Sequence, residues 1–375
     1  MSVEQCLPEL VLKSSGGEVY RLVLPPPTLA GSDLEVLPQL PGFRDFLTSW
    51  VVVAERWVLV IDVGPSRTIP SLVQSLSEMG VKAQYEAGKD LFILLTHVHI
   101  DHSGGLGDLI RDFPRARVVV HPRGRPHLVD PASLWKGSIE TLGDLAYAYG
   151  QIKPVPHGMI LEANAGPGSD TFLETDILPR EVEIFPTPGH ASHHQSYLVH
   201  LGADTVLFSG EAAGIYLGET NCASHIRRCE KAPENIYLRP ATPPRFFYDV
   251  YVDSLRNLEQ YEPSLICYGH FGYTDDKGLL LREENQLGLW KDIIWEEAMG
   301  ASRSGAYSPA SSGGLEDDDG LLIDRILERL LSEDPLLSGF CSLPQDISLR
   351  EEYFLKNSIK GFAGYIKSAS NEKDL

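Results

Sequence analysis

Residues 96–102, Thr-His-Val-His-Ile-Asp-His, crowd three histidines and an aspartate together at the end of an apolar run. His97 and His99 are two residues apart, so on an extended chain their side chains point the same way. Asp101 and His102 follow where a helix is expected to begin. Imidazole and carboxylate are ligands of zinc, iron and manganese. The spacing therefore predicts a metal site where a buried strand meets a helix.

Three further side chains of the same types follow other expected strands. His190 comes after a Pro-Gly turn, Glu211 after a turn of small residues, and His270 after the apolar run Leu-Ile-Cys-Tyr-Gly. Loops that leave one edge of a sandwich converge on that edge, where ligand-binding residues commonly lie. Burying several imidazoles and carboxylates together without a metal would be costly. We therefore expect these side chains to join the same metal site.

The elements that would position these side chains follow from hydrophobic spacing. In the first half of the chain, strand and helix patterns alternate: two strands within 47–63 with a turn at Glu55 and Arg56, a helix over 69–80, a strand over 91–96, a helix over 104–114 and a strand over 117–121. The later patterns predict strands over 181–187, 194–201, 204–210 and 264–270, and helices over 246–262 and 276–298. Alternation of this kind predicts an α/β layered architecture.

Composition suggests three parts to the chain. Residues 1–300 carry the predicted strands and all the candidate ligands, and are expected to form one domain. Within it, residues 122–178 are rich in Pro, Gly and mixed polar residues, and are expected to cover or border the site. Residues 301–320 are small, polar and acidic, which is typical of a flexible linker. Residues 321–375 would form a helical extension.

The extension begins with an amphipathic helix over 321–332 that places Leu322, Ile326 and Leu330 on one stripe. A second helix is predicted near 347–367. A 13-residue helix is marginal alone, so the stripe needs a partner. Three alternatives stay open: packing on the parent chain, pairing with a second copy in a homodimer, or binding another protein.

The overall composition excludes some function classes. The net charge of −20 and pI near 5.0 argue against a nucleic-acid-binding surface, which would require a basic face. No secretory signal or membrane-spanning run is visible. The five cysteines are scattered, so we expect reduced thiols in a cytoplasmic protein. Cys222, His225 and Cys229 could suggest a zinc knuckle, but their spacing fits no usual structural zinc site.

The motifs together resemble the metallo-β-lactamase-fold hydrolases, in particular uncharacterised prokaryotic members. The resemblance covers roughly residues 45 to 275 and rests on five features in order: an acidic strand end at Asp62, the HxHxDH run at 97–102, a TPGH-type turn at His190, a strand–Gly–acid turn at Glu211 and the late His270. It implies a four-layered αββα sandwich with a two-metal site.

The resemblance also implies a ligand set. It assigns three side chains to the first metal and three to the second: His97, His99 and His190, then Asp101, His102 and His270. Asp62 would orient the loops that carry the ligands. Glu211 stands where the family usually has a bridging Asp, so it could bridge both ions, bind one only, or leave the second site weak. Two zinc ions are expected, with iron or manganese as alternatives.

The implied activity is metal-dependent hydrolysis of an ester-like bond (ester, thioester, lactone or phosphodiester) in a small molecule. Asp101 would orient the attacking water and pass its proton to the leaving group. Four arginines have two possible roles, to bind an anionic group of that substrate or to keep the surface soluble: Arg123, Arg125, Arg239 and Arg245. Two other function classes stay open: a mononuclear iron oxygenase or redox protein, and a non-catalytic scaffold whose C-terminal helices dock on a partner.

Overall fold

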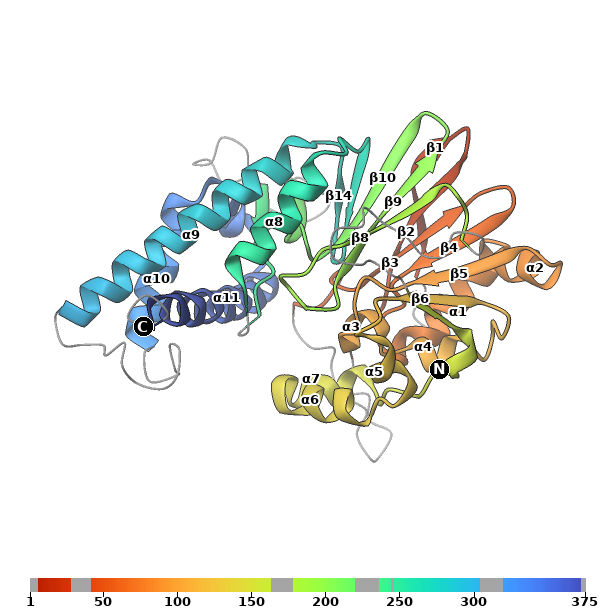
Figure 1. Ribbon diagram of the computed structural model, residues 1–375, viewed down its shortest axis with the longest axis horizontal. Coiled ribbons are helices and arrows are strands. Elements are labelled where there is room, and N and C mark those ends of the chain that lie inside the picture. Colours follow the sequence, from red (N-terminus) through yellow and green to blue (C-terminus); the bar gives the residue numbers. More distant parts are fainter. Residues whose placement is uncertain are drawn as a thin grey trace. The chain divides into compact units, whose positions relative to one another are not determined.

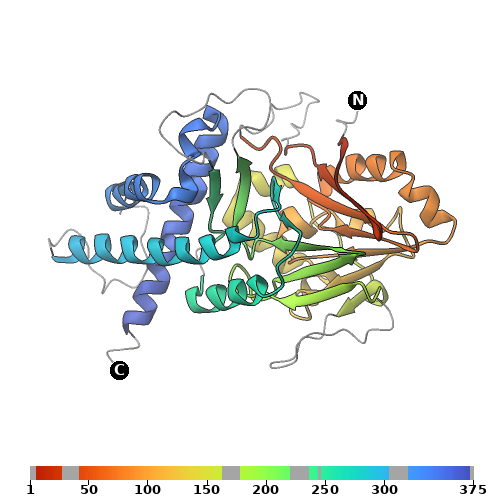
Figure 2. The same cartoon turned by 90° about the horizontal axis from the view of Figure 1, so that it is seen from above.

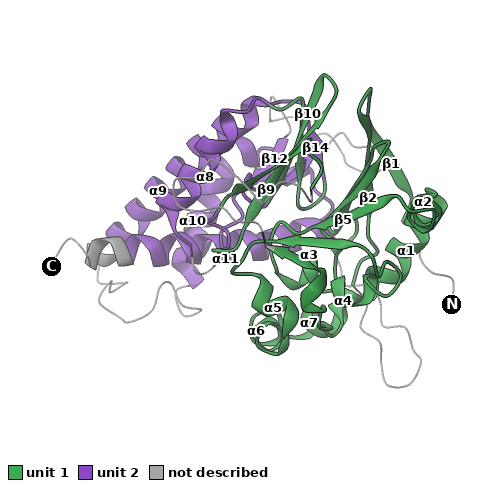
Figure 3. Ribbon diagram, turned by 45° about the vertical axis from the view of Figure 1, so that its right-hand side comes forward, with its two compact units in different colours: residues 1–187, 192–210, 263–271 green, residues 188–191, 211–262, 272–375 purple. Residues whose placement is uncertain are grey.

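The structure is a computed structural model that describes residues 6–27, 42–162, 178–219, 236–243, 246–303 and 320–371. The chain forms two compact units (Figure 3). Unit 1 comprises Met1–Thr187, Ser192–Gly210 and Pro263–Phe271, and unit 2 comprises Pro188–Ala191, Glu211–Glu262 and Gly272–Leu375. Most of the expected linker at 301–320 lies outside the described residues, as do Cys222, His225, Cys229 and Arg245.

The first sheet of unit 1 has the strand order β1-β2-β3-β4-β5-β6-β7 (Figure 1). The strand bounds are, in chain order, Pro8–Ser14, Gly17–Val23, Thr48–Val53, Trp57–Ile61, Asp90–Leu94, Arg117–Val120 and Ile160–Glu162. Strands β1 to β4 pair antiparallel, whereas β4 to β7 pair parallel. The predicted turn at Glu55 and Arg56 joins β3 to β4, and the predicted buried strand is β5, whose last four residues are all buried.

The second sheet has the order β14-β13-β10-β9-β8. Its strands are β8 Val182–Pro186, β9 Gln195–Leu201, β10 Asp204–Gly210, β13 Leu265–Tyr268 and the two-residue β14 Tyr273–Thr274. Strands β8, β9 and β10 form an antiparallel meander, and β13 pairs parallel to β10. Parallel pairing places the ends of β10 and β13 at the same edge, where the Gly269 amide donates to the Gly210 carbonyl at 2.8 Å.

Large side chains of unit 1 fill the space between the two sheets. Trp50 of β3 packs edge to face on Phe208 of β10, with ring centroids 6.1 Å apart, and its indole N–H donates to the Tyr268 carbonyl at 2.8 Å. The Tyr197 hydroxyl of β9 donates to the Leu95 carbonyl at 2.6 Å. Aromatic groups of this size contribute strongly to a core when their polar atoms find partners. The sheets are therefore the two inner layers of a sandwich.

Short helices occupy the crossovers of unit 1. They are α1 Ile69–Glu78, α2 Val81–Glu86, α3 Ile100–Ser103, α4 Leu106–Leu109, α5 Arg125–Val129, α6 Ala132–Leu142 and α7 Asp144–Tyr149. The prediction of a helix over 104–114 was wrong in extent, because the helix in this segment, α4, covers only Leu106–Leu109 and is separate from α3. The Gly105 amide donates to the Gly64 carbonyl at 2.8 Å instead of continuing the first helix. Helices α5 to α7 and β7 occupy the described part of the segment 122–178.

The described part of unit 2 contains a two-stranded sheet, β11 Ile215–Glu219 with β12 Ile236–Arg239, and four α-helices. The helices are α8 Tyr248–Glu259, α9 Gly278–Arg303, α10 Gly320–Glu333 and α11 Gln345–Asn371. Helix α9 contacts α8, α10 and α11, and Figure 2 shows α11 crossing α9. Leu322, Ile326 and Leu330 of α10 are buried. The predicted amphipathic stripe therefore packs within its own chain.

An ion cluster fixes α11 to β12 within unit 2. Arg239 Nε donates to Glu351 Oε2 at 2.5 Å, the Tyr237 hydroxyl donates to the same oxygen at 2.8 Å, and Arg350 pairs with Glu351 Oε1. Burial alone would raise the pKa of Glu351, but attraction to Arg239 and Arg350 outweighs it and holds the pKa below its ordinary value. Arg239 is therefore a buried structural residue, and of the four arginines it is not available to bind an anionic group of the substrate.

No helix among the described residues is long and apolar enough to cross a membrane.

Candidate metal centre

Asp62 connects the end of β4 to the start of the histidine run. Its carboxylate is buried, and its backbone φ of +52° is a conformation that non-glycine residues rarely adopt away from functional sites. Asp62 Oδ1 accepts from the Thr96 amide at 2.8 Å, and Oδ2 accepts from the Thr96 hydroxyl at 2.7 Å. Oδ2 also lies 2.8 Å from His102 Nδ1. One carboxylate thus joins the ends of β4 and β5 to a candidate ligand.

These hydrogen bonds assign the ring protons of two histidines. His97 Nδ1 lies 3.0 Å from Thr96 Oγ1, whose own proton goes to Asp62. The hydroxyl must then accept the Nδ1 proton of His97, and Nε2 of that ring keeps a lone pair. His102 donates its Nδ1 proton to Asp62 in the same way. Partners of this kind orient histidines that bind metals through Nε2.

Asp101, His102 and His270 form one group of candidate ligands in unit 1. Their ligand atoms all lie within 4.8 Å of one another. Asp101 Oδ2 is 3.6 Å from His270 Nε2 and 3.9 Å from His102 Nε2, which is too far for a hydrogen bond. Two ligands about 2.1 Å from a tetrahedral ion lie roughly 3.4 Å apart. The spacing of this group therefore suits a shared cation better than direct contact.

His270 is held from its other side. Its Nδ1 lies 3.1 Å from the Phe46 carbonyl, and its ring stacks on the Phe46 ring with centroids 4.0 Å apart. The carbonyl can only accept, so Nδ1 carries the proton and Nε2 has the lone pair. His97 Nε2 and His99 Nδ1, also in unit 1, lie 2.9 Å apart. Two ring nitrogens at this distance share a proton or bind one cation.

Unit 2 supplies His190 and Glu211, whose side chains meet directly. His190 Nδ1 lies 2.8 Å from the Ala241 carbonyl and so donates its proton there. Nε2 then faces Glu211 Oε2 at 2.7 Å, and both residues are buried. An imidazole lone pair and a carboxylate oxygen repel each other at this distance unless they share a proton or a metal ion. The pair is therefore suited to bind a cation.

Tyr251 of α8 fixes the turn that carries Glu211. Its hydroxyl donates to the Glu211 carbonyl at 2.8 Å and accepts from the Gly214 amide at 3.1 Å. The carboxyl of Glu283 lies 3.2 Å from the same hydroxyl. Burial raises the pKa of Glu283 well above its ordinary value, and the hydrogen bond that the Tyr251 hydroxyl donates to this carboxyl opposes the shift. The Glu211 turn is thus held by a buried chain of hydrogen bonds.

The same helix supports the turn that carries His190. Gly189 adopts a φ of +141°, and a Cβ added there would lie 2.7 Å from the Tyr251 backbone and ring. Ser254, one helical turn after Tyr251, donates to the Pro188 carbonyl at 2.6 Å. Only glycine permits so close an approach between the turn and the helix. Spacing in the sequence predicted helix α8 but contained no signal of these supporting roles.

The seven predicted ligands gather, within each unit, into sets of side chains that could bind a cation. In unit 1 these sets are His97 with His99, and Asp101 with His102 and His270; in unit 2 the set is His190 with Glu211. These side chains are buried or partly buried, and their imidazole nitrogens and carboxylate oxygens are ligands that zinc, iron and manganese prefer. Of the other histidines, buried His194 bonds to Thr187, and His200 pairs with Glu183.

Comparison with protein families decides the family. The sequence model described as the metallo-beta-lactamase superfamily matches residues 43–270, which is more than half of the chain. The chain belongs to the metallo-beta-lactamase superfamily. The resemblance inferred from the HxHxDH run and the strand-end motifs is therefore confirmed, as is the predicted α/β fold of that superfamily with a C-terminal helical region.

Individual relatives agree with this membership. The metallo-beta-lactamase fold-containing protein ST1585 of Sulfurisphaera tokodaii is 28% identical over 260 residues, 66% of this chain and 84% of that protein. Its crystal structure aligns with a TM-score of 0.50 over 86% of this chain and 97% of the other. The crystal structure of a metallo-beta-lactamase family protein of Thermus thermophilus, TTHA1429, aligns at 17% identity with a TM-score of 0.51 over 94% of each chain. Hydroxyacylglutathione hydrolase 2 of Vibrio vulnificus is 24% identical over 193 residues, 46% of this chain and 72% of that enzyme.

Proposed function

We propose that this protein is a metal-dependent hydrolase that uses a metal-activated water to cleave an ester-like bond in a small molecule. The observation that carries the proposal is the pairing of lone-pair nitrogens with carboxylates. His190 Nε2 faces Glu211 Oε2 at 2.7 Å, and Asp101 stands between two imidazoles without a hydrogen bond to either. Superfamily membership supports the same activity, because the superfamily includes hydrolases such as hydroxyacylglutathione hydrolase.

We propose two groups of ligands, each of which would hold one zinc ion. His97, His99 and His190 would hold the first ion, and Asp101, His102 and His270 the second. Glu211 would contact the first ion from its position beside His190. The longer side chain of Glu, in place of the Asp usual in the family, reaches the His190 ring within unit 2, and this contact favours the first ion.

A bound divalent ion supplies two things: it lowers the pKa of its water towards neutrality, and it polarises the oxygen of a carbonyl or phosphoryl group. The chain supplies the proton transfer. Asp101 is the partly exposed member of its group, at 20% of its side-chain area, whereas His102 and His270 are buried. Water and substrate can therefore reach its carboxylate, which would orient the water, take its proton and return it to the leaving group.

Thioesters are the first substrate class to test. Several relatives are named hydroxyacylglutathione hydrolase, at 24 to 30% identity over 24 to 46% of this chain. An acyl-glutathione is a thioester, and hydrolysis of thioesters, esters and lactones needs the same activated water. We further propose a cytoplasmic location and no nucleic-acid partner, in line with the net charge of −20 and the buried thiols of Cys6 and Cys267.

The test is hydrolysis by zinc-reconstituted protein of a panel of thioesters, esters, lactones and phosphodiesters, with Asp101→Asn and His97→Ala as variants. We expect turnover of at least one class, abolished by a chelator, restored by zinc, and reduced at least about a hundredfold in Asp101→Asn. Lys136→Ala, on an exposed face of α6, is the matched control and should retain full turnover. Turnover that survives both the chelator and His97→Ala would overturn the proposal.

A further inference from the structure

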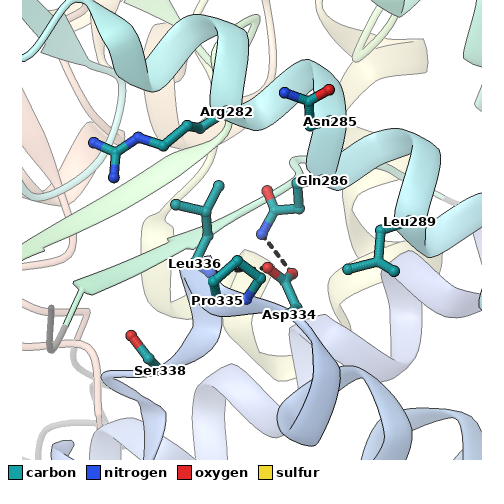
Figure 4. Close-up of a pocket in the computed structure, with 8 residues that line it drawn as sticks. All are labelled: Arg282, Asn285, Gln286, Leu289, Asp334, Pro335, Leu336 and Ser338. Carbon is teal, nitrogen blue, oxygen red and sulfur yellow. Dashed lines mark hydrogen bonds between the residues drawn. The ribbon is translucent and has the colours of Figure 1, made fainter. Parts of the chain in front are cut away.

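Unit 2 contains a cavity whose lining includes none of the candidate metal ligands. It has a volume of about 590 Å³, within the range typical of small-molecule sites. Its lining comes from one face of α9 and from the segment after α10: Arg282, Asn285, Gln286 and Leu289, and Asp334, Pro335, Leu336 and Ser338 (Figure 4). Both elements belong to the helical part of the chain, for which the superfamily match at residues 43–270 assigns no function.

Gln286, which lines this cavity, carries a buried acceptor atom that has no partner among the described residues. Its Nε2 donates to the Leu238 carbonyl at 2.8 Å and to Asp334 Oδ2 at 2.7 Å. The reversed amide would place an oxygen against two acceptors, so the orientation is fixed. Oε1 has no hydrogen-bond partner in the described part of the chain, although the side chain is only 3% exposed. In Figure 4 this oxygen points away from Asp334.

Asp334 adds a buried carboxylate next to that acceptor. It is 3% exposed and accepts from Gln286, from Trp290 Nε1 at 2.7 Å and from the Leu336 amide at 2.9 Å. No cationic side chain among the described residues forms an ion pair with it. Burial raises the pKa of Asp334, and the three hydrogen bonds oppose this shift. A buried carboxylate without a counter-charge attracts a cation.

The rest of the lining sets the shape of a ligand. Leu289, Pro335 and Leu336 make the walls apolar. Arg282 is already ion-paired with Asp276, so its charge is compensated. An anion would have to approach Asp334, which disfavours it, while a purely apolar molecule would leave Gln286 Oε1 unpaired.

We propose that this cavity binds a small organic cation, a primary ammonium or amidinium group on an apolar body. Its N–H groups donate to Gln286 Oε1 and to the Asp334 carboxylate, and its body lies against Leu289 and Leu336. Two acceptors, one of them a carboxylate without a counter-charge, and apolar walls match this class of ligand. None of the residues in this proposal is a candidate metal ligand, so its test is distinct from that of the proposed hydrolase activity.

Benzylamine is a suitable probe, with benzyl alcohol and benzoate as its neutral and anionic counterparts. Binding to the full chain is measured by ligand-observed NMR or calorimetry. We expect a Kd on the order of 1 mM for benzylamine, as for other fragments of this size, at least about fivefold weaker binding of benzyl alcohol, and no saturation with benzoate. The same titrations on Asp334→Asn should abolish the preference for the amine over the alcohol.

Two tryptophan variants of α9 locate the site. Leu289→Trp places a large ring in the cavity from a half-buried position and should weaken benzylamine at least tenfold. Leu281→Trp, at a position 54% exposed and outside the cavity lining, is the matched control and should bind within twofold of the original chain. Equal binding of benzylamine and benzoate, unchanged affinity in both Leu289→Trp and Asp334→Asn, or no benzylamine saturation at all would overturn the proposal.

Discussion

Replacing Tyr251 with Phe removes one hydroxyl from the support of the Glu211 turn. The change breaks the bonds to the Glu211 carbonyl at 2.8 Å and from the Gly214 amide at 3.1 Å, and it deprives Glu283 of its partner. Each buried hydrogen bond contributes about 1 kcal/mol net, and a buried group left unpaired costs about 1–3 kcal/mol. Because Gly214 keeps a second contact with the Glu211 carbonyl at 3.3 Å, we expect a loss of roughly 2–3 kcal/mol in the free energy of unfolding.

The stronger prediction concerns metal binding. A residue that supports a metal ligand through hydrogen bonds typically changes metal affinity by about 10–100-fold when it is replaced. We therefore expect Tyr251→Phe to weaken zinc binding by this factor, measured by titrating metal-free protein against a chromophoric chelator. Tyr237→Phe is the matched control, since Tyr237 is equally buried but bonds to Glu351, outside both candidate metal groups. Equal zinc affinity in the two variants would refute the positioning role of α8.

Three other substitutions test separate parts of the structure. Glu283→Gln should be more stable than the original chain at pH 8 but not at pH 4. The pKa of Glu283 is raised in the native state, so the stability of the original chain falls by up to about 1.4 kcal/mol per pH unit above the ordinary pKa of 4.5. The same difference in melting temperature between variant and original chain at both pH values would contradict this. Glu351→Ala leaves Arg239 and Arg350 buried without their partner and should cost about 3–5 kcal/mol in chemical denaturation, whereas a loss under about 1 kcal/mol would show that the cluster is hydrated. Gly189→Ala should push the His190 turn off Tyr251 and weaken zinc binding, while Gly137→Ala, whose Cβ meets nothing within 4 Å, should leave zinc binding unchanged.

The parts of the fold that sequence spacing predicted are those with local signals. The apolar runs gave β3, β4 and β5 correctly, because a strand buried on both faces needs continuous apolar residues. The HxHxDH run was visible because its ligands are adjacent in the chain. Strands β1 and β2 were missed, since their residues are mostly only half-buried and carry charges that hide the pattern.

What spacing could not predict depends on contacts between distant segments. Arg239 looked like a surface arginine, but its partner Glu351 lies 112 residues further along the chain. The break between α3 and α4 comes from a bond between Gly105 and the Gly64 carbonyl, which belongs to another loop. The expected division into domain 1–300, linker 301–320 and extension 321–375 stays a prediction, although α10 and α11 do contact α9.

The most direct test of the metal centre is the zinc content of the purified chain after equilibration of metal-free protein with zinc, measured by mass spectrometry. We expect about two ions per chain for the original sequence, about one for His270→Ala and a further loss when His97→Ala is added, because the two substitutions remove ligands from different proposed groups. An original chain that retains no zinc, or a double variant that retains two ions, would contradict the claim that these histidines form a metal centre.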